Sequence, residues 1–182
     1  MFSVISIAAS LVLARVALAN PVARAACNPA LAGVGISIAS GDLEVGYTGG
    51  VAGASIISQA LTTAGAEYLA EAATTVNGGF VLKDINQAGN AAGLFVTWVN
   101  GAIELETLVT PEDGKQGWGF VCSTCNDPST VAEGGVIASS CNVVNGWTGQ
   151  CLQIGSAAGA AVAVANCADL GSGSQYFSVY KS

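Results

Sequence analysis

The hydrophobic and polar positions of this chain follow one short pattern that occurs three times. Each occurrence starts at a Leu, continues through an alternating run and reaches a Gly-Ala pair, and an apolar strand start precedes it. The occurrences are Leu43-Glu-Val with Gly53-Ala-Ser-Ile, Leu94-Phe-Val with Gly101-Ala-Ile-Glu-Leu, and Leu152-Gln-Ile with Gly159-Ala-Ala-Val. Internal repetition indicates a fold built from copies of one unit. The sequence therefore predicts three four-strand repeats, at about residues 34–75, 78–122 and 134–180.

Short alternating runs bounded by Gly, Asn or Pro predict strands within these repeats. The clearest runs are Ile36–Ile38, Phe80–Leu82, Leu94–Val99, Ile103–Val109 and Ala161–Ala165. Between two of them, Asn100-Gly101 is the strongest hairpin signal in the chain, because both positions adopt positive φ at low cost. We therefore expect an all-β domain.

Two segments need a choice between interpretations. The stretch from Ala54 to Ala73 is rich in Ala and Leu and favours a helix by propensity. Its start aligns with strand starts in the other two repeats, so we expect strands there instead. The stretch from Ser123 to Glu133 lies between the second and third repeats and contains Asn126-Asp-Pro128, which predicts a loop anchored by cysteine.

The N-terminal residues have the features of an export signal. An apolar stretch from Phe2 to Ala14 precedes Ala17-Leu18-Ala19, the small-x-small pattern that signal peptidase cleaves. The stretch is shorter than the about 20 apolar residues that a membrane-spanning helix needs. We expect a signal peptide at residues 1–19, a short pro-segment at 20–26 and a single secreted, extracellular domain at 27–182, without membrane insertion.

Composition excludes several classes of function. Twelve acidic residues against five Lys and Arg give a net charge of −7, which excludes nucleic acid as a partner. The chain has no His, and this removes Ser-His and Cys-His nucleophile systems and His-ligated catalytic zinc. Glu104 and Glu106 lie on one face of a predicted strand, where a solvated surface is the favoured interpretation. We therefore expect no enzyme activity, no metal and no cofactor.

Six cysteines in an exported chain predict disulfides. Cys151 and Cys167 bracket a hairpin that brings them together, so this pair is expected. The sequence leaves the pairing of the other four open; they are Cys27, Cys122, Cys125 and Cys141. We interpret the Cys122-Ser-Thr-Cys125 segment as structural, because zinc needs four such ligands and a redox motif belongs on a βαβ fold.

The third repeat, from Cys151-Leu-Gln-Ile through Asn166-Cys167 to Gln175-Tyr-Phe177, resembles the ricin B-type β-trefoil lectins. Their closing motif is Gln-x-Trp, which Gln116-Gly117-Trp118 in the second repeat matches. The resemblance implies a β-trefoil of three four-strand repeats with Trp118 in the core. With its small residues and export signal, the chain also looks like small secreted proteins of filamentous fungi.

The sugar positions of such lectins are degenerate in this chain. The acid expected after the repeat's Leu is present as Glu44 and replaced in the other two repeats by Phe95 and Gln153. The aromatic that stacks on the sugar is replaced in all three repeats, by Gln59, Thr107 and Ala165. The usual galactose pocket is thus missing.

Polar and aromatic residues near predicted turns give an alternative surface for a ligand. The candidate ligand-binding residues are Glu44, Trp98, Asn100, Asn145 and Trp147. Two functions follow, each without catalysis. The first is a ricin B-like binding module for a glycan or another extracellular partner. The alternative is a β-trefoil protease inhibitor that acts on an extracellular protein through an exposed loop such as Ser123–Glu133.

Overall fold

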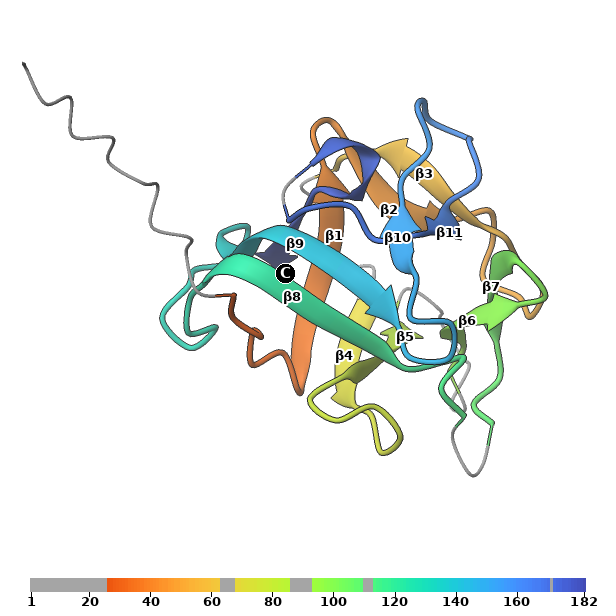
Figure 1. Ribbon diagram of the computed structural model, residues 1–182, viewed down its shortest axis with the longest axis horizontal. Coiled ribbons are helices and arrows are strands. Elements are labelled where there is room, and N and C mark those ends of the chain that lie inside the picture. Colours follow the sequence, from red (N-terminus) through yellow and green to blue (C-terminus); the bar gives the residue numbers. More distant parts are fainter. Residues whose placement is uncertain (1–25, 63–67, 86–92, 110–112, 171) are drawn as a thin grey trace, which may run out of the picture.

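Strands account for nearly all regular structure in the described part of the chain (Figure 1). The computed structural model describes residues 26–62, 68–85, 93–109, 113–170 and 172–182. The predicted signal peptide at 1–19, and the predicted pro-segment up to residue 25, lie outside the described residues. The strands are β1 (Val34–Ser40), β2 (Leu43–Tyr47), β3 (Ile56–Ala60), β4 (Tyr68–Ala72), β5 (Phe80–Asp84), β6 (Phe95–Val99), β7 (Ala102–Glu106), β8 (Trp118–Cys125), β9 (Val136–Asn145), β10 (Cys151–Gln153), β11 (Ala163–Ala165) and β12 (Phe177–Lys181), with a 3₁₀ turn η1 at Gly173–Gln175.

The strands form one antiparallel sheet that closes on itself. Nine strands follow a single hydrogen-bonded path, β11-β10-β9-β12-β1-β4-β5-β6-β7, and β2, β3 and β8 branch from it. Strand β8 pairs with both β5 and β9, and this closes a barrel whose wall runs through β1, β4, β5, β8, β9 and β12. The hairpins β2–β3, β6–β7 and β10–β11 extend from the wall. Closure leaves the wall without an open strand edge.

The hairpin β6–β7 has the turn that its sequence predicts. Val99 pairs with Ala102, so Asn100 and Gly101 form a two-residue loop. Their φ angles are 49° and 99°, and this left-handed geometry matches the twist of the two strands.

Tertiary pairing overrides helix propensity between Ala54 and Ala73. Strands β3 and β4 occupy the described parts of this segment and pair with β2 and with β1 and β5; residues 63–67 lie outside the described residues. The loop expected over Ser123–Glu133 is partly wrong, because β8 continues to Cys125 in register with β9. The strand predicted at Ala161–Ala165 is shorter in the structure, where β11 covers Ala163–Ala165.

The barrel encloses an aromatic and aliphatic core. The aromatic side chains of Tyr68, Trp118 and Phe177 have no exposed surface, and that of Phe120 is 2% exposed. Trp118 lies in the core as expected, and its indole Nε1 donates a hydrogen bond of 2.9 Å to the Val96 carbonyl. That bond satisfies the one polar atom that burial of the ring takes out of water.

Three disulfides cross-link the barrel. The predicted Cys151–Cys167 bond is present and spans 16 residues. The pairs that the sequence left open are Cys122–Cys141, across β8 and β9, and Cys27–Cys125, which ties the start of the described chain to the end of β8. The backbone of Cys27 also exchanges two hydrogen bonds with Cys122, so the segment before β1 is anchored at two points.

Candidate functional site

A pocket of about 300 Å³ lies between the β6–β7 hairpin and the loop before β8. Two segments surround it: the hairpin with the residues that follow β7, and the loop before β8. Its lining residues are Thr97, Trp98, Val99, Asn100, Glu106, Thr107, Val109, Asp113 and Lys115. They supply two carboxylates, one ammonium, two hydroxyls and one amide. This mixture suits a small polar or charged ligand.

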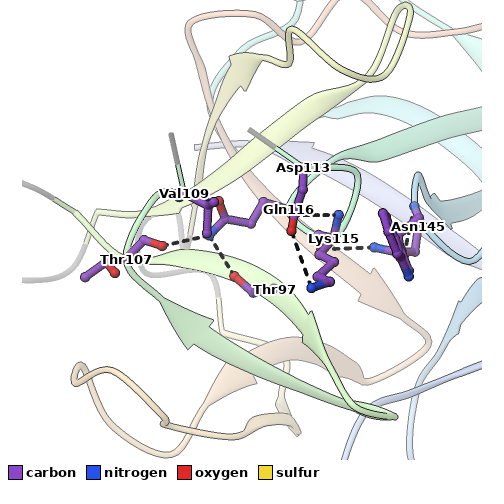
Figure 2. Close-up of polar contacts among 8 residues, drawn as sticks. Thr97, Thr107, Val109, Asp113, Lys115, Gln116 and Asn145 are labelled. Carbon is purple, nitrogen blue, oxygen red and sulfur yellow. Dashed lines mark hydrogen bonds and ion pairs between the residues drawn. The ribbon is translucent and has the colours of Figure 1, made fainter. Parts of the chain in front are cut away.

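The buried side chain of Gln116 holds the two segments together (Figure 2). Its Nε2 donates to Thr97 Oγ1 at 3.0 Å and to the Thr107 carbonyl at 2.9 Å, and its Oε1 accepts from the Val109 amide at 2.8 Å. The loop before β8 thereby fixes the chain on both sides of the hairpin. Because every bond is made inside the protein, the pocket wall is formed before a ligand arrives.

The same arrangement recurs in the third repeat. Gln175 Oε1 accepts from the Ala168 amide at 2.8 Å, and its Nε2 donates to the Asn166 carbonyl at 3.0 Å. In both repeats the aromatic residue two positions later, Trp118 or Phe177, is buried in the core. The Gln-x-aromatic pattern thus closes a hairpin loop against the barrel.

Lys115 gives the pocket its cation. Its Nζ lies 3.5 Å from Asp113 Oδ2 and 5.3 Å from the centroid of the Trp147 ring. The backbone of the same segment is fixed from both ends, since the Lys115 amide donates to Asp113 Oδ1 and its carbonyl accepts from the amide of Trp98. The ammonium therefore lies at the rim of the pocket beside an indole that is 59% exposed.

Asn145 supports this rim from within the protein. It is completely buried, and its Nδ2 donates to the Lys115 carbonyl at 3.1 Å (Figure 2). Its Oδ1 accepts from the amides of Trp147 and Thr148, at 3.2 and 3.1 Å. These bonds shape the turn after β9 and hold the Trp147 backbone next to the Lys115 loop. As placed, Asn145 positions other residues and offers no surface to a ligand.

Four of the five predicted ligand-binding residues belong to this one region. Trp98 and Asn100 line the pocket, Trp147 forms its rim, and Asn145 supports the rim. The indole N–H of Trp98 is buried and has no hydrogen-bond partner within the described ranges. The residues lie up to 49 positions apart in the chain, between Trp98 and Trp147, and the fold brings them together.

Glu44 lies elsewhere and is completely buried in β2. Its Oε1 accepts hydrogen bonds from Gln59 Nε2 at 3.1 Å and from the amide and hydroxyl of Thr62 at 3.3 and 3.2 Å. Its Oε2 has no partner among the described residues. The acid of the first repeat therefore makes internal hydrogen bonds. Its partners, Gln59 and Thr62, do not line the pocket on the β6–β7 hairpin.

Sequence reasoning missed the charged part of the pocket. Lys115 and Asp113 stand two residues apart around Gly114, and this turn signal, together with the scarcity of cations in the chain, marks them in retrospect. Of the two strand carboxylates that the sequence places on one face, Glu106 lines the pocket. Glu104 is not among the lining residues and pairs with Thr97 in the ladder between β6 and β7.

The described ranges contain neither a cluster of side chains for a metal ion nor a helix that could cross a membrane. No group of three or more Cys, Asp or Glu side chains there is arranged to hold a metal ion. In the same residues, no helix has the length and apolar character that crossing a bilayer requires.

No family model and no curated protein sequence matches this chain. Solved structures do share its fold. A chain from the crystal structure of the lysenin pore matches with a TM-score of 0.53 and 11% identity, over 81% of this chain and 44% of that chain. A chain from a mosquitocidal holotoxin matches with a TM-score of 0.58 and 13% identity, over 81% of this chain and 17% of that chain. The chain thus spans less than half the length of each of these two chains.

These findings correct the ricin B-type prediction. The fold is shared with parts of chains from a pore and a holotoxin. The expected ricin B β-trefoil is therefore wrong, and the strand pairings give an all-β, closed antiparallel barrel with outer strands. The prediction failed because it relied on the Gln-x-aromatic motif. In this fold Gln116 and Gln175 each hold a hairpin loop by local hydrogen bonds, and such a motif does not specify a family. The glycan-binding module, the protease inhibitor and the fungal-type assignment are withdrawn with it.

Proposed function

We propose that this chain is a secreted toxin-type domain that attaches a larger pore-forming assembly to the surface of its target. The observation that carries the proposal is the match of 81% of the chain to parts of two chains, one from a pore and one from a holotoxin. In both matches most of the other chain lies outside the shared fold. We assign the attachment step, rather than the pore itself, to the shared part.

The covalent structure of the barrel supports attachment. Cys122–Cys141 crosses β8 and β9 within the barrel wall, and Cys27–Cys125 ties the chain before β1 to β8. Strands joined in this way separate only after a disulfide is broken. A rigid surface loses little conformational entropy when it binds, so the same feature favours recognition.

The pocket on the β6–β7 hairpin is the surface that we propose for contact with the target. Exposed apolar side chains flank it, with Trp147 at 59%, Leu108 at 39% and Val109 at 45% exposure. Aromatic side chains are effective at interfaces because one end is apolar and the other polar. The charges of Glu106, Asp113 and Lys115 beside them provide selectivity for a polar group.

We further propose that the domain acts outside the cell and without catalysis or cofactor. Three disulfides fit an oxidising compartment. The absence of His from the sequence supports a role in contact rather than in acid–base chemistry.

Attachment and leakage, measured together, test the proposal. The disulfide-bonded chain, labelled with a fluorophore, is added to erythrocytes, to cultured insect cells and to vesicles of phosphatidylcholine with and without phosphatidylserine. We expect saturable attachment to at least one of these surfaces and no release of dye trapped in the vesicles. Trp147→Ala and Lys115→Met should weaken attachment.

Tyr176→Ala is the matched control, since Tyr176 is a partly exposed aromatic of the third repeat outside the pocket. Circular dichroism checks that each variant is folded. Absence of attachment to every surface would overturn the proposal. Dye release by the chain alone would also overturn it, because the chain would then form pores by itself.

A further inference from the structure

Three Asn-Gly pairs occur in the chain, at Asn77, Asn100 and Asn145. In such a pair the backbone nitrogen after Asn reaches the Asn side-chain carbonyl with little hindrance, because glycine has no Cβ. Ring closure between these atoms releases the side-chain nitrogen as ammonia. The three pairs have the same local chemistry, so their surroundings in the fold decide which of them reacts.

Asn100 and Asn77 are open to this reaction. Both side chains are exposed, and neither amide has a hydrogen-bond partner among the described residues. A Cβ placed on Gly101 or on Gly78 would meet nothing within 4 Å. The chain around both pairs therefore has room to adopt the geometry that the ring requires.

The fold keeps Asn145 out of the geometry that ring closure requires. The amide is completely buried and donates to the Lys115 carbonyl, while its oxygen accepts from Trp147 and Thr148. The nitrogen that would attack belongs to Gly146, and it donates to the Gly117 carbonyl at 2.8 Å. A Cβ on Gly146 would collide with the side chain of Val76. Reaction at Asn145 therefore requires local opening of the turn.

We infer that Asn100 and Asn77 are sites of spontaneous deamidation in the folded protein and that Asn145 is protected. The Gly101 nitrogen forms a bond to Asn100 Cγ, the Cγ–Nδ2 bond breaks, and ammonia leaves with the amide proton. Water then opens the cyclic imide at one of its two carbonyls. The products are Asp, with the original backbone, and isoaspartate, whose backbone runs through the side chain.

Deamidation at Asn100 changes the pocket, whereas deamidation at Asn77 does not. Asn100 lines the pocket with Glu106, Asp113 and Lys115. A new carboxylate there adds one negative charge beside two carboxylates and one ammonium. Isoaspartate also lengthens the two-residue turn between β6 and β7, which disturbs the register of the hairpin. The inference itself does not depend on the proposed attachment role.

Peptide mapping tests the inference, because Lys83 and Lys115 place the three pairs in separate tryptic peptides, 25–83, 84–115 and 116–181. The folded full chain is incubated at mildly alkaline pH, then reduced, digested and sequenced by fragmentation that distinguishes Asp from isoaspartate. An opening free energy of only ~1.4 kcal/mol slows a reaction about tenfold, so Asn100 and Asn77 should convert at least about tenfold faster than Asn145.

The reduced chain in urea is the control, and there the three pairs should convert at similar rates because the fold no longer distinguishes them. Asn100→Gln should remove the change in the 84–115 peptide and leave conversion at Asn77 unaltered. The inference is overturned if Asn100 converts no faster than Asn145 in the folded chain while both convert in urea. It is also overturned if Asn145 keeps its protection after unfolding.

Discussion

The ammonium of Lys115 lies 5.3 Å from the centroid of the Trp147 ring. The same Nζ is 3.5 Å from Asp113 Oδ2, so the cation stands between a carboxylate and an indole. Both contacts lie near the surface, where a cation–π contact contributes about 0.5–1 kcal/mol and an exposed ion pair about 0.2–1 kcal/mol. They orient the two side chains at the rim of the pocket more than they stabilise the fold.

A double-mutant cycle measures the Lys115–Trp147 contact. We expect Lys115→Met and Trp147→Leu to be coupled by about 0.5–1 kcal/mol in the free energy of unfolding, since either substitution removes the contact. Urea unfolding provides the four free energies. The control cycle combines Lys83→Met with Trp147→Leu, because Lys83 pairs with Glu71 on another part of the sheet. Equal coupling in the two cycles would contradict the prediction.

The disulfides should differ in what they contribute to stability. Cys27 and Cys125 are separated by 98 residues, and Cys151 and Cys167 by 16. In the chain-entropy model, loops of about 100 and about 15 residues correspond to about 4.7 and about 3 kcal/mol. Replacing Cys27 and Cys125 by Ala should therefore lower the unfolding free energy more than replacing Cys151 and Cys167. Guanidinium unfolding of the two double variants decides, and the reverse order would refute the expectation.

The loop after β8 should respond to acid through Asp127. The hydroxyl and then the backbone amide of Ser129 donate to its carboxylate, and they lower the pKa of Asp127 below the ordinary value of 3.8. A lowered pKa means that this contribution to stability is present above about pH 3.8 and is lost as the pH falls through the folded-state pKa. The effect is therefore confined to the acid end of the pH range.

Ser129→Ala should raise the pKa of Asp127 toward its ordinary value, because the largest cause of the shift is removed. Carboxyl NMR titration measures it directly. Thr130→Val is the control, since the Thr130 hydroxyl donates to the Asp127 backbone carbonyl and not to its carboxylate. A pKa that stays unchanged in Ser129→Ala would show that the hydroxyl bond is not the cause.

Local features of the fold could be predicted from the sequence. The Asn100-Gly101 turn requires only the backbone freedom of two adjacent residues. The Cys151–Cys167 bond follows from a hairpin that closes over 16 residues. In both cases the residues that decide the structure are close together in the chain, so the pattern contains the information.

Long-range features could not be predicted in this way. Cys27 reaches Cys125 only because β8 passes the segment before β1, where the backbones of Cys27 and Cys122 are hydrogen-bonded. Lys115 reaches Trp147 only because the turn after β9 folds back on the loop before β8. Glu44 shows the same limit, since nothing near it in sequence indicates complete burial. The family resemblance failed for a related reason, because Gln-x-aromatic motifs record a local closure that says little about the rest of the molecule.

Gln116 gives the sharpest test of how the pocket is built. Gln116→Leu replaces the amide with an apolar side chain of similar size and removes three hydrogen bonds, including the buried one to Thr97. Thr97 Oγ1 keeps its hydrogen bond to the Phe95 carbonyl, so the loss is that of the three bonds to Gln116. A hydrogen bond contributes about 0.5–1.5 kcal/mol, so we expect the unfolding free energy to fall by about 1–3 kcal/mol. Gln175→Leu is the matched comparison. Its two partners, at Asn166 and Ala168, belong to exposed residues that water can reach, and the loss there should be smaller.

Hydrogen exchange locates the effect of Gln116→Leu. The Val109 amide loses its acceptor, Gln116 Oε1, and should exchange faster in this variant. The Ala168 amide donates to Gln175 and should keep its rate, while the opposite pattern is expected in Gln175→Leu. If Gln116→Leu unfolds at the wild-type denaturant concentration and the Val109 amide keeps its protection, the strands alone determine the pocket wall and Gln116 does not hold it.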